Sequence, residues 1–116
     1  MSAWKQIRLE LASTRDFPLG SVARAYLLRL PLADDDHVDV AAYRRSPALA
    51  VVHRHWSTEP DQSGQLFEVG VDWIIRSEGN PESRLELDGK ALRLGQHIPL
   101  KLSEGNVVPL RIASIR

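Results

Sequence analysis

The sequence predicts a mainly β fold: a single small barrel or sandwich of about seven or eight antiparallel strands, with one short helix near residues 40–46. Three observations predict it. Apolar and polar residues alternate in several short segments, turn-forming residues separate these segments, and one short helical segment interrupts them. Alternation with a period of two is typical of strands with one buried face. The 116 residues correspond to one domain, spanning residues 1–116.

The longest alternating segment covers residues 66–76, and we expect the fold to be organised around it. Its odd positions are all apolar and include Val71 and Trp73, whereas its even positions are mostly polar or small, as at Glu68. The pattern predicts one continuous strand whose odd positions face the core and whose even positions face water. A charge buried at Val71 is then expected to abolish folding.

Two strands are predicted before this segment. Residues 4–12 alternate apolar and polar side chains, and the turn-rich residues 13–20 that follow predict a loop. Residues 22–32 predict a second strand with both faces partly buried. The competing prediction for residues 21–30 is a helix, because their alanine, leucine and arginine residues are good helix formers.

A short helix is predicted over residues 40–45, between an acidic loop and a proline. Asp39 can cap its amino end, because a carboxylate accepts hydrogen bonds from the free N–H groups of the first turn. Arg44 and Arg45 would lie near its carboxyl end, where the helix dipole favours cations. Pro47 ends the helix because the residue before a proline is biased away from the helical region.

The chain after the helix is predicted to return to strands. Residues 48–56 predict a third strand, and residues 57–65, with their proline, aspartate and glycine, predict a loop. Beyond the central segment, Asp88 and Gly89 predict a type I′ turn that joins a strand at residues 84–87 to one at residues 90–94.

The last part of the chain predicts a closing hairpin. Apolar and polar residues alternate over residues 98–102 and again over residues 108–112. The residues between them, 104–106, are a glutamate, a glycine and an asparagine, which suit a tight turn. Short strands with frequent turn signals favour a barrel or sandwich.

The composition excludes several classes of protein. There is no cysteine, which excludes disulfides, thiolate metal sites and cysteine nucleophiles. Lysine and arginine total 15, as do aspartate and glutamate. A net charge of zero makes nucleic acid an unexpected partner, because phosphate neutralisation usually requires a basic excess. No apolar run is long enough for a membrane span or a signal peptide, which predicts a cytoplasmic location without membrane contact.

The sharpest candidate site is His53, His55 and Glu59, in the pattern H-x-H-x-x-x-E. Residues two apart on a strand point the same way, so two imidazoles and a carboxylate could hold a divalent metal. The spacing resembles the first metal motif of the cupin family, and the resemblance implies a metal-binding barrel with His97 as the last ligand. The alternative is a pair of half-exposed strand histidines beside Trp56. Apart from this metal, the sequence predicts no cofactor.

A second candidate surface lies in residues 43–56, which contain no acidic residue and have an aromatic residue at each end. Aromatic and arginine side chains are the typical anchors of protein interfaces. The predicted contact residues for a protein partner are Tyr43, Arg44, Arg45, Arg54, Trp56 and Arg76. The same types of side chain could instead stack on bases and bind phosphates, as in a nucleic-acid-binding barrel. The oligomeric state stays open.

Catalytic motifs are absent from the sequence: there is no G-x-S-x-G and no glycine-rich phosphate loop. Residues 26–32, the acidic turn, Asp39 and the helix that ends at Pro47 are similar to a family of short, uncharacterised bacterial proteins. That resemblance implies no activity. The sequence therefore favours a non-enzymatic binding or interaction module of unknown role, with a cupin-like metal protein or enzyme and a nucleic-acid-binding barrel as alternatives.

Overall fold

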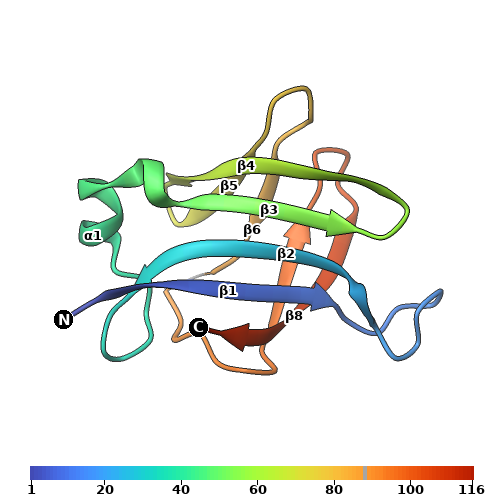
Figure 1. Cartoon of the computed structure of the whole chain (residues 1–116), viewed down its shortest axis with the longest axis horizontal. Coiled ribbons are helices and arrows are strands. Elements are labelled where there is room, and N and C mark those ends of the chain that lie inside the picture. Colours follow the sequence, from blue (N-terminus) through green and yellow to red (C-terminus); the bar gives the residue numbers. More distant parts are fainter. Residues whose placement is uncertain (88) are drawn as a thin grey trace.

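The computed structural model describes residues 1–87 and 89–116, which form a closed antiparallel barrel of eight strands with one short α-helix (Figure 1). The predicted mainly β fold is confirmed. Helix α1 (Val40–Arg45) and a 3-10 helix (Pro47–Leu49) lie between β2 and β3. The strands are β1 (Ala3–Leu11), β2 (Ser21–Leu32), β3 (Val51–Trp56), β4 (Glu59–Val69), β5 (Asp72–Arg76), β6 (Ser83–Leu85), β7 (His97–Lys101) and β8 (Val107–Ile115).

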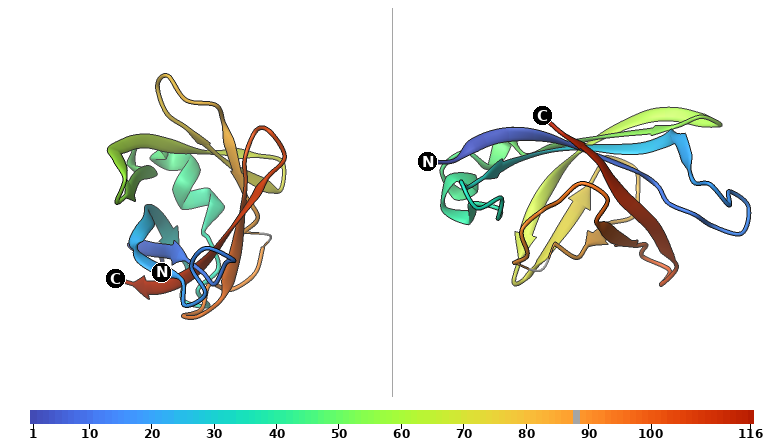
Figure 2. Two further views of the ribbon diagram at one scale, coloured as in Figure 1. Left: turned by 90° about the vertical axis from the view of Figure 1, so that its right-hand side faces the viewer. Right: turned by 90° about the horizontal axis from the view of Figure 1, so that it is seen from below.

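Each strand pairs with the next in the sequence, and β8 returns to pair with β1. Consecutive antiparallel pairing places the connections alternately at the two ends of the barrel. We call one the capped end; it carries α1 and the connections at residues 33–50, 70–71 and 86–96. We call the other the open end; it carries the connections at residues 12–20, 57–58, 77–82 and 102–106. Figure 2 (left) looks into the barrel from the right-hand side of Figure 1, with α1 on the far side.

The core lies inside the barrel and is built from alternate residues of its strands. The alternation predicted over residues 4–12, 98–102 and 108–112 is confirmed, because Ile7, Leu9, Leu11, Ile98, Leu100, Leu110 and Ile112 are buried. The strand predicted over residues 22–32 is also confirmed, although Val22 at its start is 72% exposed. The helix considered for residues 21–30 is wrong, since β2 is paired on both sides, with β1 and with β3. Fully buried leucines come from six strands: Leu9, Leu30, Leu66, Leu85, Leu100 and Leu110.

The segment expected to be one central strand is instead a hairpin. β4 ends at Val69, and Gly70, with its φ of 63°, forms a two-residue turn with Val71 before β5 begins. Glycine adopts this left-handed backbone conformation without steric cost. The predicted orientation is wrong for β4 and the turn, where Leu66 is buried while Val69 and Val71 are 46% and 76% exposed. It holds in β5, where Trp73 faces the core. The prediction that a charge at Val71 abolishes folding is therefore wrong.

Two further predictions are corrected. Residues 57–65 are not a loop: only Ser57 and Thr58 form the turn, and β4 begins at Glu59. Residues 90–94 form no strand, and β6 ends at Leu85. The predicted type I′ turn includes Asp88, which lies outside the described residues.

The short helix is confirmed with its predicted cap. The side chain of Asp39 accepts a hydrogen bond from the Ala42 N–H at 3.0 Å, and Pro47 follows the helix. None of the helices formed by the described residues has the length and the apolar composition that crossing a bilayer requires.

Candidate binding site

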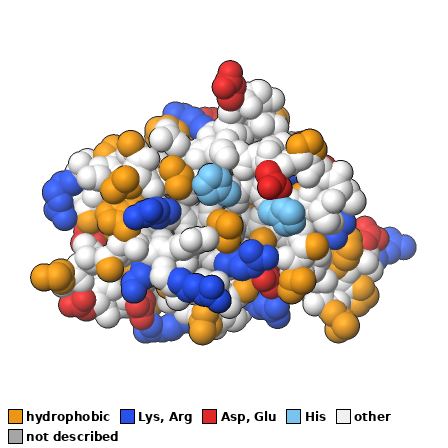
Figure 3. Space-filling model, in the orientation of Figure 1, with side chains coloured by type: hydrophobic (Ala, Val, Ile, Leu, Met, Phe, Trp, Pro, Cys, Tyr) orange, Lys and Arg blue, Asp and Glu red, His pale blue; other side chains and the backbone are white. Residues whose placement is uncertain are grey.

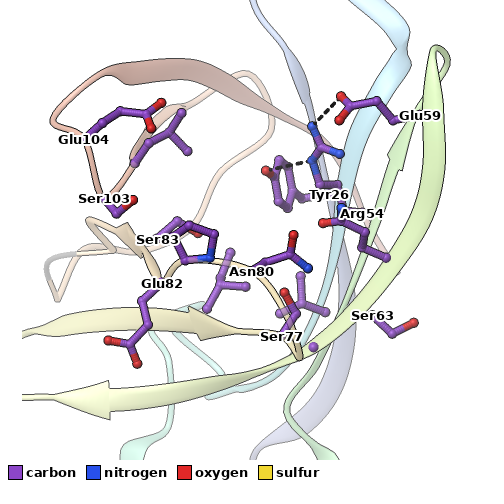
Figure 4. Close-up of a pocket in the computed structure, with 16 residues that line it drawn as sticks. Tyr26, Arg54, Glu59, Ser63, Ser77, Asn80, Glu82, Ser83, Ser103 and Glu104 are labelled. Atoms are coloured by element: carbon purple, nitrogen blue, oxygen red, sulfur yellow. Dashed lines mark hydrogen bonds and ion pairs between the residues drawn. The ribbon is translucent and has the colours of Figure 1, made fainter.

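The open end of the barrel contains a cavity of about 240 Å³ (Figure 4). β3 and β4 form one wall, residues 77–83 form a second, and residues 102–104 form the third. The deeper part is apolar and is lined by Val52, Ile75 and Leu102. The polar lining includes Arg54, Gln62, Ser77, Asn80, Ser103 and Glu104. The apolar core of the barrel therefore ends in a polar cavity.

Arg54 is the most constrained polar side chain of this cavity. The alternation along β3 turns it to the same side as the buried Val52, and only 19% of its side chain is exposed. Its Nε donates a hydrogen bond to the hydroxyl of Tyr26 at 3.2 Å, and its Nη2 donates to Glu59 at 3.1 Å. The guanidinium also lies 4.6 Å from the centroid of the Trp56 ring. Three neighbours thus hold the guanidinium in place.

These contacts keep Arg54 charged and the Tyr26 phenol protonated. Partial burial acts to lower the pKa of Arg54, but the hydrogen bonds with Glu59 and Tyr26 outweigh it, so the pKa is raised and the charge is retained. Burial raises the pKa of the Tyr26 phenol, and Arg54 offsets part of this rise. The phenol therefore stays protonated and keeps a hydrogen that it can donate.

Gly64 on β4 allows the second wall to lie close to the first. A Cβ at this position would lie 2.4 Å from the carbonyl oxygen of Arg76 and 3.0 Å from the Cβ of Ser77. Arg76 pairs with Glu82 across the base of this wall. Figure 4 shows Ser77 and Asn80 on one side of Arg54, and Ser103 and Glu104 across the cavity.

The structure does not bring the predicted metal ligands together. His53 and His55 point outward from β3, where Nδ1 of His53 lies 3.0 Å from the Ser63 hydroxyl. Glu59 pairs with Arg54 at the cavity, and His97 lies on β7, which does not adjoin β3. Within residues 1–87 and 89–116, no group of three histidine, aspartate or glutamate residues is placed to hold a metal ion.

The six residues predicted to contact a partner do not form one surface. Tyr43 is buried at the capped end, where its hydroxyl donates to the Leu66 carbonyl at 3.1 Å. Arg44 and Arg45 are exposed beside it at the end of α1. The other three, Arg54, Trp56 and Arg76, lie at the open end of the barrel.

Sequence reasoning missed the amide and hydroxyl groups of the cavity. Gln62 falls within residues predicted to be a loop, and Ser77 and Asn80 fall in a segment rich in turn residues. Such residues are common in exposed turns, so nothing in their pattern indicates a binding site. Gln62, Ser77 and Asn80 are recognised as one site only because the folded chain brings the walls of the cavity together.

The fold and the site together define a small closed β-barrel with a polar cavity at one end. Comparison of the chain with models of known families, with characterised proteins and with solved structures found no match. No activity is carried over from a relative, and the likeness to short bacterial proteins supplies none.

Proposed function

We propose that this protein is a non-enzymatic binding module that takes a small, uncharged, hydroxyl-rich molecule of the size of a sugar into the cavity at the open end. The observation that supports this proposal is Arg54, a charged side chain held by three neighbours at the wall of a cavity with an apolar floor. A few oriented polar groups above an apolar floor are typical of ligand sites. The volume, about 240 Å³, suits a molecule of this size.

The charges of the lining favour an uncharged ligand. Glu59 is paired with Arg54 and Glu82 is paired with Arg76, so these charges are largely compensated. Glu104 adds a carboxylate at the rim, which would repel an anion. The remaining polar groups are amides and hydroxyls, which both donate and accept hydrogen bonds. A ligand with several hydroxyl groups matches this mixture.

The arrangement of the lining gives no support to catalysis. The Ser63 hydroxyl lies 3.0 Å from Nδ1 of His53, which is close enough for a nucleophile and its base. However, both side chains are exposed, and Figure 4 shows the side chain of Ser63 pointing away from the cavity. Among the described residues, no acid is hydrogen-bonded to His53 to orient it, which such a base needs.

The proposal is tested by an NMR titration of the full chain with a panel of monosaccharides and disaccharides. We expect at least one sugar to shift the amide signals of Gln62, Ser77 and Asn80, with saturation. Arg54→Met should abolish these shifts. Lys90→Met removes the same charge from an exposed position at the capped end and should leave them unchanged.

Two results would contradict the proposal. One is the absence of saturable shifts at the cavity with every sugar of the panel. The other is a titration that Arg54→Met leaves intact. Capture of a protein partner that depends on Arg54 and Trp56 would instead make this end a protein interface. The cytoplasmic location stays a prediction, which cell fractionation would test.

A further inference from the structure

The outer face of the barrel carries a second hollow region, separate from the cavity at the open end. Two adjoining depressions, of about 360 and 340 Å³, cross the outside of β1, β2 and β3 near the end of β8. They share Gln6, Leu27 and Arg116, so they form one continuous groove. We call it the outer groove; Figure 3 looks onto this face, with histidine and basic side chains near its centre.

The lining of the outer groove is strongly basic. It includes Arg8, Arg29, Arg116 and His53, and none of its described residues is acidic. Arg8 is compensated by Glu10, to which its Nε donates at 2.7 Å. Arg29 and Arg116 form no ion pair with the described residues. A chain with a net charge of zero thus gathers unpaired positive charge on one face.

The strand register explains how residues distant in the sequence meet here. Gln6 of β1 lies opposite Arg29 of β2, and the backbone of Gln6 is hydrogen-bonded to that of Arg116. Neighbouring strands lie about 4.8 Å apart. Arg29 of β2, Gln6 of β1 and Arg116, which follows the end of β8, therefore form a row, and Arg8 lies in the next row. Such a row can meet a chain of regularly spaced phosphates.

An aromatic side chain and an apolar floor complete the groove. Trp4 lines it and packs partly against the core, which fixes one side of the residue and leaves part of it exposed. Leu27 and Val51 lie between the basic residues, and both are only half-buried. Aromatic residues beside arginines provide stacking platforms for unpaired bases, which a duplex does not offer.

We propose that the outer groove binds single-stranded nucleic acid, with phosphates at Arg29 and Arg116 and a base stacked on Trp4. Charge complementarity supplies the affinity, and stacking distinguishes nucleic acid from other polyanions. The groove is separate from the cavity that contains Arg54, so this proposal and the proposed sugar site can fail independently.

The test is fluorescence anisotropy of labelled dT and rU oligonucleotides of about twelve nucleotides with the full chain, over a range of salt concentrations. Contact with two phosphates predicts a slope of log K against log salt of about −1.4, since each contributes about −0.7. Arg29→Gln should weaken binding and reduce the slope by about 0.7. Arg15→Gln removes the same charge from the exposed loop at the open end and should change neither.

Trp4 tests the stacking part of the proposal. Trp4→Ala should weaken binding about tenfold or more without changing the salt slope. Trp4→Phe, which keeps a stacking ring, should lose much less and serves if the alanine variant does not fold. Arg54→Met, at the cavity, should leave oligonucleotide binding unchanged.

Three outcomes would overturn the proposal. The first is no binding of either oligonucleotide at low salt. The second is equal loss in the Arg29→Gln and Arg15→Gln variants, which would indicate attraction to the whole molecule. The third is binding that neither Trp4 variant alters and that heparin matches, which would indicate a site for any polyanion.

Discussion

The two ends of the barrel enclose the same core but close it in different ways. At the capped end, the rings of Tyr43 and Trp73 meet edge to face with centroids 4.8 Å apart, and Leu87 and Leu92 are buried beside the core. At the open end, the interior meets Arg54 and a cavity lined by amides and hydroxyls. One end is sealed by apolar side chains, whereas the other presents polar groups to solvent.

The lengths and compositions of the connections account for this difference. The connections at the capped end include residues 33–50 and 86–96, which are long enough to turn apolar side chains back over the core. The Leu92 N–H donates to the Asp36 carbonyl at 3.0 Å and ties the two connections together. At the open end, β3 and β4 are joined by only two residues, and the longer connection at residues 12–20 turns its Leu19 side chain to solvent instead of over the barrel. The capped end is thus closed by packed apolar side chains, and the open end leaves the proposed sugar site accessible to solvent.

The largest effect should follow from removing the ring that seals the capped end. Trp73 is buried, so Trp73→Ala should lower the free energy of unfolding by about 3–5 kcal/mol. That is a large part of the total stability of a domain, about 5–15 kcal/mol. Urea unfolding followed by circular dichroism measures it. Val71→Ala, two residues away but exposed, should change it by less than about 0.5 kcal/mol; similar losses in both variants would contradict the comparison.

At the open end, the sharpest structural test is Gly64→Ala. The added Cβ would lie 2.4 Å from the carbonyl oxygen of Arg76, so the backbone must move apart. We expect a loss of about 1–3 kcal/mol in the free energy of unfolding. The NMR signals of residues 77–82 should shift, because this wall of the cavity follows Arg76. Ser63→Ala, on the exposed neighbouring position, should shift them much less; unchanged signals in Gly64→Ala would show that the walls are not in contact.

The same contrast explains which strands could be predicted from the sequence. Alternation revealed the segments whose inward positions are apolar, such as residues 4–12 and 98–102. It failed for residues 57–65, because the inward positions of β4 near the open end are Gln62 and Gly64, which face the polar cavity. A strand whose interior side is polar carries no hydrophobic period.

The turn in the middle of the chain and both sites escaped prediction for other reasons. Apolar residues continue through the turn at Gly70 and Val71, so no change of composition indicates where β4 ends. The outer groove is lined by Arg8 of β1, Arg29 of β2 and Arg116, which follows β8, and these residues meet only through the strand register. The zero net charge is a total and does not show that basic side chains gather at the outer groove.

A smaller change in the free energy of unfolding should follow from removing either of the two buried tyrosine hydroxyls, and it should differ between the two ends. Tyr43→Phe removes a buried hydrogen bond to the Leu66 carbonyl and should lower the free energy of unfolding by about 1–2 kcal/mol. Tyr26→Phe removes the hydroxyl that accepts from Arg54 at the cavity, where water can take its place. We therefore expect a smaller loss for Tyr26→Phe in the same urea measurement. The reverse order would mean that the open end is as closed to solvent as the capped end.

The smallest effect concerns the pH dependence of α1 at the capped end. The hydrogen bond from the Ala42 N–H, with smaller contributions from Ser2 and Arg45, lowers the pKa of Asp39 below its ordinary value. A carboxylate with a lowered folded-state pKa contributes stability above its unfolded-state pKa, and this contribution is lost as the pH falls through the folded value. Asp39→Asn keeps an oxygen that can cap the helix but removes the titration. The stability of the native protein should exceed that of the variant at about pH 5, and the two should converge toward about pH 2, below the ordinary aspartate pKa of about 3.9.

The control is Asp16→Asn, in the exposed loop at the open end, whose stability should change with pH in the same way as that of the native protein. A constant difference between native protein and Asp39→Asn across this range would show that the charge of the cap does not stabilise the helix.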